Sequence, residues 1–248
     1  MSKAPLIVFF LAAALTLEAQ EKIGETVSLE GEVSITRNGD ALDSSAVVIG
    51  VPIDNFDLMG TGDDGNAQVK ITATRAAAST ITVSPDTQFT FELSTLQGRQ
   101  ASSINLISGS LSLKVSKLSG SQDLDVQTES TVLGVRGTEF NVSMSDAGDV
   151  LVSCSEGAVS CRTENGAEYR AVPGTVVENQ AGGAFRTIPV SVSNVESFRQ
   201  TWAEQRREAA RANASSLIQM NAERYQQLRA SDDTDYMALM RQRSVVSV

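Results

Sequence analysis

The sequence contains no histidine and only two cysteines among its 248 residues. The absence of histidine excludes nucleophile activation by Ser-His-Asp or Cys-His groups, and it also excludes every histidine-ligated metal site. Two cysteines are too few for a four-thiolate zinc site. These absences remove large classes of enzymes and metalloproteins, and we expect a protein that carries no cofactor or metal.

Basic residues are also scarce, since 20 lysines and arginines face 30 aspartates and glutamates, for a net charge of −10. This balance argues against nucleic acid and against an anionic membrane surface as partners. The charge is unevenly distributed: residues 20–192 hold 22 acidic and 11 basic side chains, whereas residues 193–248 hold 7 and 8. The shift coincides with a change from Val, Thr, Ser and Gly to Ala, Arg, Gln and Glu, which predicts a domain boundary near residue 192.

Only one stretch is apolar enough to meet a membrane, and it lies at the start of the chain. Lys3 precedes an apolar run at residues 6–15, and Ala19 is a small residue placed for cleavage before Gln20. This pattern is typical of a secretory signal peptide, here residues 1–19, because the run is about half of the ~20 residues that a membrane-spanning helix needs. An uncleaved anchor is the alternative. We expect a protein that is periplasmic, secreted or held at the cell surface.

Short alternating segments with frequent turn residues fill residues 20–192, which predicts a mainly β domain. Three segments share one pattern around a glycine: residues 29–35 (LEGEVSI), 107–113 (ISGSLSL) and 155–161 (SEGAVSC). We interpret each as a strand that bends at the glycine and resumes with its inward face restored. The predicted architecture is an antiparallel β-sandwich or jelly roll, or a solenoid-like stack of short strands.

The third copy holds both cysteines. If Gly157 and Ala158 form a two-residue hairpin loop, Cys154 and Cys161 face each other on paired strands at a separation that a disulfide can bridge. In an oxidising compartment we expect that disulfide to form as a structural staple, with a redox centre as the alternative.

Residues 131–142, TVLGVRGTEFNV, place two glycines around an arginine between alternating apolar residues. We predict a structural corner in which Gly134 and Gly137 permit the bend and Val135 and Phe140 reach the core. Arg136 is predicted to pair with Glu139, and a ligand or signalling contact is the alternative role for this pair. The predicted corner comprises Gly134, Val135, Arg136, Gly137, Thr138, Glu139 and Phe140.

After residue 192 the spacing becomes helical, and a helix is predicted over residues 194–229, starting at a Ser193 and Glu196 capping box. Its predicted apolar contact stripe consists of Val195, Phe198, Trp202, Ala209, Leu217 and Met220. Because heptads do not continue, docking on the preceding β domain is favoured over a coiled-coil dimer.

Several of these segments together resemble the FecR domain. The resemblance lies in residues 57–71 (DLMGTGDDGNAQVKI), 79–89 (STITVSPDTQF), 107–111 (ISGSL) and 134–140 (GVRGTEF), followed by Glu156-Gly157-x-Val159 and Pro173-Gly174. Their order agrees over about residues 25–185. The resemblance implies an extracytoplasmic β domain that contacts other envelope proteins without catalysis. Family members that regulate iron uptake have a cytoplasmic anti-sigma segment and a membrane span before this domain, whereas this sequence shows a signal peptide there.

The resemblance therefore favours a non-enzymatic interaction module in envelope sensing or organisation, with another envelope protein as partner. The alternative is a binding protein for a small ligand or a cell-wall glycan.

Overall fold

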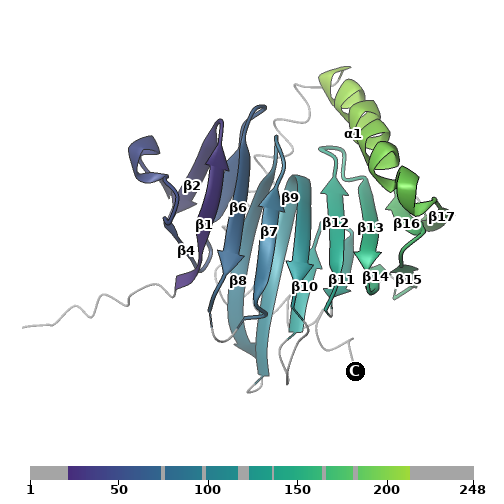
Figure 1. Ribbon diagram of the computed structural model, residues 1–248, viewed down its shortest axis with the longest axis horizontal. Coiled ribbons are helices and arrows are strands. Elements are labelled where there is room, and N and C mark those ends of the chain that lie inside the picture. The colour runs from purple at the N-terminus through teal and green to yellow at the C-terminus, as the bar shows by residue number, and fades with distance from the viewer. Residues whose placement is uncertain are drawn as a thin grey trace, which may run out of the picture.

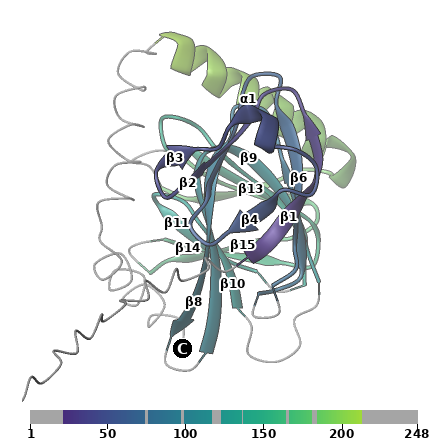
Figure 2. The ribbon, with the colours of Figure 1, turned by 90° about the vertical axis from the view of Figure 1, so that its left-hand side faces the viewer.

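The computed structural model describes residues 22–73, 76–96, 99–116, 123–135, 137–163, 166–180 and 184–212. In these residues the chain forms two stacked β layers and one α-helix, α1 (Val195–Ala212), which lies across one end of a layer (Figures 1 and 2). The mainly β prediction with a C-terminal helix is thus confirmed. The predicted signal peptide lies outside the described residues and stays a prediction, as do the domain bounds at residues 19 and 192.

The first layer is sheet A. It contains the first strand of the described chain, β1, and the strands on which α1 packs, β13 and β16. Its spatial order is β4 (Pro52–Asp54), β1 (Lys22–Glu30), β6 (Asn66–Ile71), β7 (Ser79–Val83), the second half of β9 (Arg99–Val115), β12 (Glu139–Met144), β13 (Val150–Glu156), β16 (Thr175–Asn179) and β17 (Arg186–Pro189). All of these neighbours run antiparallel, as predicted.

The second layer, sheet B, shares β9 with the first. Its spatial order is β3 (Asp40–Ala41), β2 (Val33–Arg37), β5 (Leu58–Thr61), β8 (Gln88–Leu96), the first half of β9, β10 (Asp123–Gln127), β11 (Thr131–Val135), β14 (Val159–Thr163) and β15 (Glu168–Ala171). The β9–β10 pair is parallel, which gives the fold its mixed character. Two short 3-10 turns, η1 (Ser44–Ala46) and η2 (Val192–Asn194), complete the described elements.

Glycine corners carry the chain from one layer to the other. Gly31, Gly109 and Gly157 sit in the three copies of the repeated pattern, and their φ angles are +62°, +90° and +83°. Each lies where the chain changes sheet: between β1 and β2, within β9, and between β13 and β14. L-residues with a side chain rarely adopt such φ values, so glycine is required there. The interpretation of the repeat as a reused bend is therefore confirmed.

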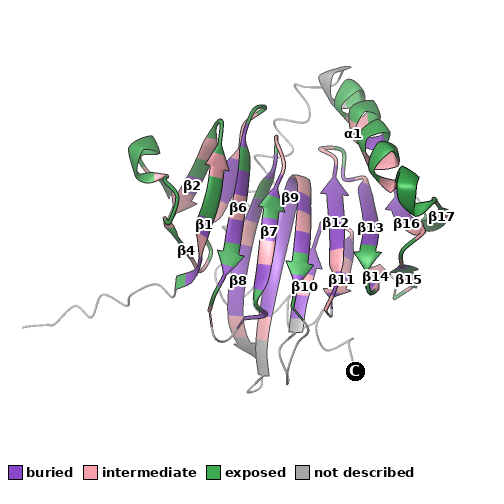
Figure 3. Cartoon of the chain, in the orientation of Figure 1, coloured by how far each residue is buried: buried purple, intermediate pink, exposed green. Residues whose placement is uncertain are grey.

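The space between the layers is filled by aliphatic and phenylalanine side chains that alternate with outward polar ones. Ile81 and Val83 on β7, for example, are fully buried, while Thr82 between them is exposed (Figure 3). The core extends from Ile23 to Val177 along the chain. A period of two along each strand produces this arrangement, because successive side chains point to opposite faces.

The local hairpin from which the cysteine pairing was predicted is not formed, and the disulfide itself stays a prediction. Strands β13 and β14 do not pair with each other, because the chain crosses from sheet A to sheet B at Gly157. Cys154 is opposite Phe140 on β12, whereas Cys161 is opposite Leu133 on β11. Both are buried free thiols in the structure. The local pattern misled because a glycine before an alternating segment suits a hairpin and a layer crossing equally well.

The buried thiol of Cys161 is expected to make the stability of the protein depend on pH. Burial raises the pKa of its thiol from 9.0 to about 12. The folded state thus favours the protonated thiol, so this contribution to stability is complete below pH 9 and is lost as the pH rises toward 12. We expect the unfolding free energy of the wild type to fall by up to about 1.4 kcal/mol per pH unit more steeply than that of Cys161→Ala in this range.

Urea titrations of both proteins between pH 8 and pH 11 measure this difference in slope. Parallel profiles would contradict the expectation. They are also the outcome if Cys154 and Cys161 form a disulfide in solution, which a thiol titration of the unfolded, unreduced protein detects as two missing thiols.

Helix α1 begins at Val195, one residue from the predicted start, and its course beyond residue 212 lies outside the described residues. The predicted capping box is not formed: the Ser193 hydroxyl donates to Asn194 Oδ1, and the Glu196 carboxylate accepts from Arg199 and Gln200. Across the described part of the chain, no helix has the length and hydropathy required to cross a membrane.

Candidate functional site

The motif at residues 131–142 forms a fourth crossing between the layers. Strand β11 belongs to sheet B and β12 to sheet A, and Gly137 between them has a φ of +61°. Val135 and Phe140 flank the corner, and both are buried in the core with exposures of 5% and 2%. The corner therefore has the structural role that the alternation predicted for these two side chains and for Gly137. A neighbouring crossing at Gly157 packs against it through Thr138.

Gly134 does not bend the chain, contrary to the prediction. It lies inside β11 with ordinary strand pairing to Asp125 and Ser160, and a Cβ built on it would have no neighbour closer than 3.9 Å. The Glu139 carboxylate lies 3.1 Å from the Lys114 ammonium. Arg136 is outside the described residues, so its pairing stays a prediction.

The second notable region is the surface on which α1 rests. Trp202 is 5% exposed and packs on Leu151 of β13 and Val176 of β16, with Phe198 and Ala203 beside it. Val195 and Phe198 are half-buried, whereas Ala209 is exposed. Leu217 and Met220 lie outside the described residues. The predicted contact stripe thus meets the chain's own β domain at its first half, centred on Trp202.

A buried carboxylate fixes the helix in place. Glu178 of β16 is 3% exposed, and its Oε1 accepts hydrogen bonds from Trp202 Nε1 at 2.9 Å and from Arg206 Nη2 at 3.2 Å. Its Oε2 accepts from Arg186 on β17. Arg206 also donates to Asp149 Oδ2 at 3.1 Å and stacks 4.8 Å from the Trp202 ring centre. Such charge-assisted and cation–π contacts fix the orientation of α1 and also stabilise its attachment to the sheet.

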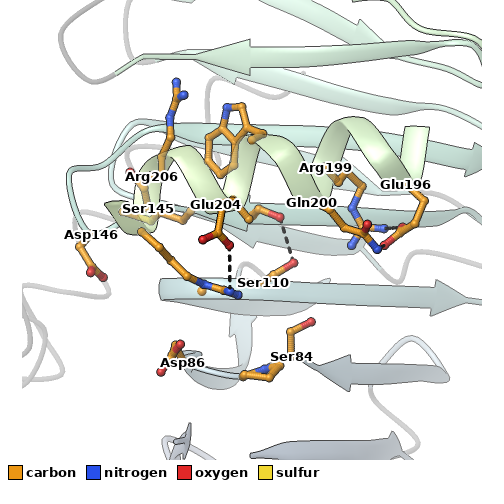
Figure 4. Close-up of a pocket in the computed structure, with 17 residues that line it drawn as sticks. Ser84, Asp86, Ser110, Ser145, Asp146, Glu196, Arg199, Gln200, Glu204 and Arg206 are labelled. Atoms are coloured by element: carbon orange, nitrogen blue, oxygen red, sulfur yellow. Dashed lines mark hydrogen bonds and ion pairs between the residues drawn. The ribbon is translucent and has the colours of Figure 1, made fainter. Parts of the chain in front are cut away.

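A cleft of about 390 Å³ lies between α1 and the turns at the end of sheet A (Figure 4). Figure 4 shows Glu196, Arg199 and Gln200 at one end and Asp86 and Asp146 at the other. Arg199 pairs with Glu196 at 2.7 Å. Desolvation by burial lowers the pKa of Arg199, and the Glu196 carboxylate opposes this shift. The Nε atom of Arg199 is buried without an acceptor.

Sequence reasoning missed Glu178, although one signal was present. The predicted stripe is interrupted by Arg206, and a buried arginine on a helix requires an acidic partner elsewhere. It also missed Arg37, which donates to both carboxylate oxygens of Asp57 at 3.0 and 2.7 Å. These hydrogen bonds are the main cause of a raised pKa for Arg37. In the described chain no group of acidic residues and cysteines is placed to hold a metal ion.

This fold is a two-layer β protein whose layers exchange the chain at glycine corners. Residues 57–160 match the family described as FecR protein, which confirms the resemblance read from the sequence. The matched segment includes the corners at Gly109, Gly137 and Gly157 and ends before α1. No curated protein sequence matches the chain.

Two crystal structures of a candidate anti-sigma factor from Parabacteroides distasonis ATCC 8503, at 2.50 and 1.65 Å resolution, are similar to the chain. Both are 16% identical in sequence, with TM-scores of 0.47 and 0.46. Each alignment covers 58% of this chain, and the chain spans 64% of the length of that solved protein.

Proposed function

We propose that this protein is a non-enzymatic interaction module that works outside the cytoplasm, in envelope sensing or organisation, and contacts another envelope protein through α1. The FecR-family segment supports a regulatory role, and the predicted signal peptide supports export. The observation that carries the proposal is the attachment of α1. Trp202 and Arg206 hold the helix on Glu178, so its opposite face is presented in one orientation.

The exposed side of α1 is polar; Glu204 and Arg207 line the cleft, whereas Gln205 and Glu208 do not. Glu204, Gln205, Arg207 and Glu208 are all exposed on α1. A partner that binds a helix already folded and docked does not have to offset the entropy of ordering it, which favours binding. Arg207 and Glu204 are 3.9 Å apart and half-exposed, so both remain able to form new ion pairs at the rim of an interface.

Site-specific photo-crosslinking in cells tests this proposal. A photoreactive residue at Gln205, on the outward face of α1, is expected to crosslink one defined envelope protein, because this face forms the contact. The same residue at Gln88, exposed on sheet B, is the matched control and should give no such product. This chain, recovered in the crosslinked product, should come from the extracytoplasmic fraction and should have Gln20 as its N-terminal residue.

Two results would count against the proposal. Equal crosslinking from Gln205 and Gln88 would remove the special role of α1. Recovery of the protein in the cytoplasm with an intact N-terminus would exclude a function outside it.

A further inference from the structure

Uncharged polar side chains form a row across four neighbouring strands on the outer face of sheet A. The register places Gln68 on β6 opposite Thr82 on β7, Thr82 opposite Ser112 on β9, and Ser112 opposite Asn141 on β12. We name these four residues the polar row. Their neighbours along each strand point into the core, so the row faces away from it; Thr82 is exposed, Gln68 and Ser112 are half-buried, and Asn141 is only 4% exposed. With strands about 4.8 Å apart, the row is about 14 Å long.

Hydrogen bonds along this face hold the row in a defined arrangement. Asn141 Nδ2 donates to Ser112 Oγ at 3.1 Å and to Ser110 Oγ at 3.0 Å, and Gln68 Nε2 donates to Thr82 Oγ1 at 3.4 Å. The hydroxyls of Ser112 and Thr82 thus accept hydrogen bonds, yet neither finds an acceptor for its own hydrogen within the described residues. Two O–H donors are therefore fixed in position beside solvent.

The polar row is neutral on an acidic protein. Charged residues of this face lie in the neighbouring rows: Lys70, Lys114 and Glu139 toward the Gly137 corner, and Glu30, opposite Asn66, on the other side. A neutral ligand could cover the row without desolvating any charge, which is the costly step in burying most protein surfaces. The row also has no aromatic or large apolar side chain of the kind that dominates the energy of protein–protein contacts. These side chains suit an uncharged ligand that carries hydroxyl and amide groups better than they suit a protein surface.

The row is continuous with the cleft beside α1. Ser110 and Ser143, whose hydroxyls are 2.9 Å apart, line the cleft and belong to the same hydrogen-bond network as Asn141. Helix α1 packs on β13 and β16, and no described helix packs on β6 or β7, so within the described part of the chain a ligand can extend from the cleft along the row (Figure 1). The resulting site has hydroxyl groups at its base and α1 along one side.

We propose that the polar row and the floor of the cleft bind an uncharged, extended β-1,4-linked glycan strand. The spacing of one strand is close to the repeat of one sugar in such a chain, so successive sugars meet Gln68, Thr82 and Ser112. Asn141 is buried and holds the Ser112 hydroxyl in position. Binding relies on hydrogen bonds to these groups. This site lies beside the proposed protein contact on the outward face of α1 and goes beyond it.

Calorimetric titration of the purified full chain with two probes, chitohexaose and cellohexaose, tests the site. The wild type is expected to bind at least one of them. The double variant Thr82→Glu/Ser112→Glu should weaken that binding at least tenfold, because it removes two donors and introduces charge into a neutral row. The matched control Ser34→Glu/Gln88→Glu adds the same charge to a row of exposed residues on sheet B and should bind as the wild type does.

Absence of binding by the wild type to both hexasaccharides would overturn the glycan site. Equal affinity of the wild type and the sheet A variant would overturn it as well, and circular dichroism of both double variants checks that they remain folded. Neither result bears on the α1 contact, which is measured separately by crosslinking from Gln205.

Discussion

Replacing Gly109 by valine is expected to lower the free energy of unfolding by about 3 kcal/mol or more. Gly109 is the corner at which β9 passes from sheet B to sheet A, and its φ is +90°. A Cβ there would lie 2.4 Å from the Thr87 Cα and 2.6 Å from the Asp86 carbonyl oxygen. Because these are backbone atoms, no side-chain movement can relieve the overlap. A β-branched residue adds further strain at a positive φ.

The control for this substitution is Gly134→Val, which places the same side chain on a glycine inside β11. There the backbone is that of an ordinary strand and the nearest atom to a Cβ is 3.9 Å away. We expect a change of less than about 1 kcal/mol, because valine suits a half-buried strand position and replaces a flexible residue. Chemical denaturation of both variants gives the comparison. Similar losses at the two positions would refute the assignment of Gly109 as a required corner.

Replacing Glu178 by alanine is expected to release α1 from the sheet while the β layers stay folded. The change removes the acceptor of Trp202, Arg206 and Arg186 at a position that is 3% exposed. Loss of one partner from a buried charged cluster costs about 3 kcal/mol, since the remaining charge must find water. Trp202 is the only tryptophan in the chain, so its fluorescence reports directly on the docking of α1.

The expected measurement is a shift of tryptophan emission to longer wavelength, together with faster tryptic cleavage after Arg199 and Arg206. Glu168→Ala is the matched control, because Glu168 is an exposed carboxylate on β15 that bonds only to Ser160 among the described residues. Unchanged emission in Glu178→Ala would show that apolar packing on Leu151 and Val176 is sufficient to hold the helix.

The motif at residues 131–142 shows which features the local sequence pattern predicts and which it does not. Alternation of apolar residues correctly placed Val135 and Phe140 in the core, because the period of two is a property of the extended chain itself. The same pattern assigned bends to both Gly134 and Gly137, and only Gly137 has a positive φ. Glycine permits a bend without requiring one, so the surrounding sheets decide where the chain turns.

The cysteines show that the local sequence does not predict which strands pair. A hairpin at Gly157 would have paired Cys154 with Cys161, and the structure instead places them in different sheets. A strand pairs with whichever neighbour buries its apolar face, and in this fold that neighbour is distant in sequence: β13 pairs with β16, and β14 with β11. No local signal in residues 150–163 specifies those partners.

The sequence by itself determined the mainly β fold, the repeated glycine corners and the FecR resemblance, because each depends on residues that are close together in the chain. The tertiary structure alone decided how Glu178 meets Trp202 and Arg206, and how Gln68, Thr82, Ser112 and Asn141 align. Those arrangements join strands and a helix separated by tens of residues. They exist only once the register between strands is fixed by burial of the core.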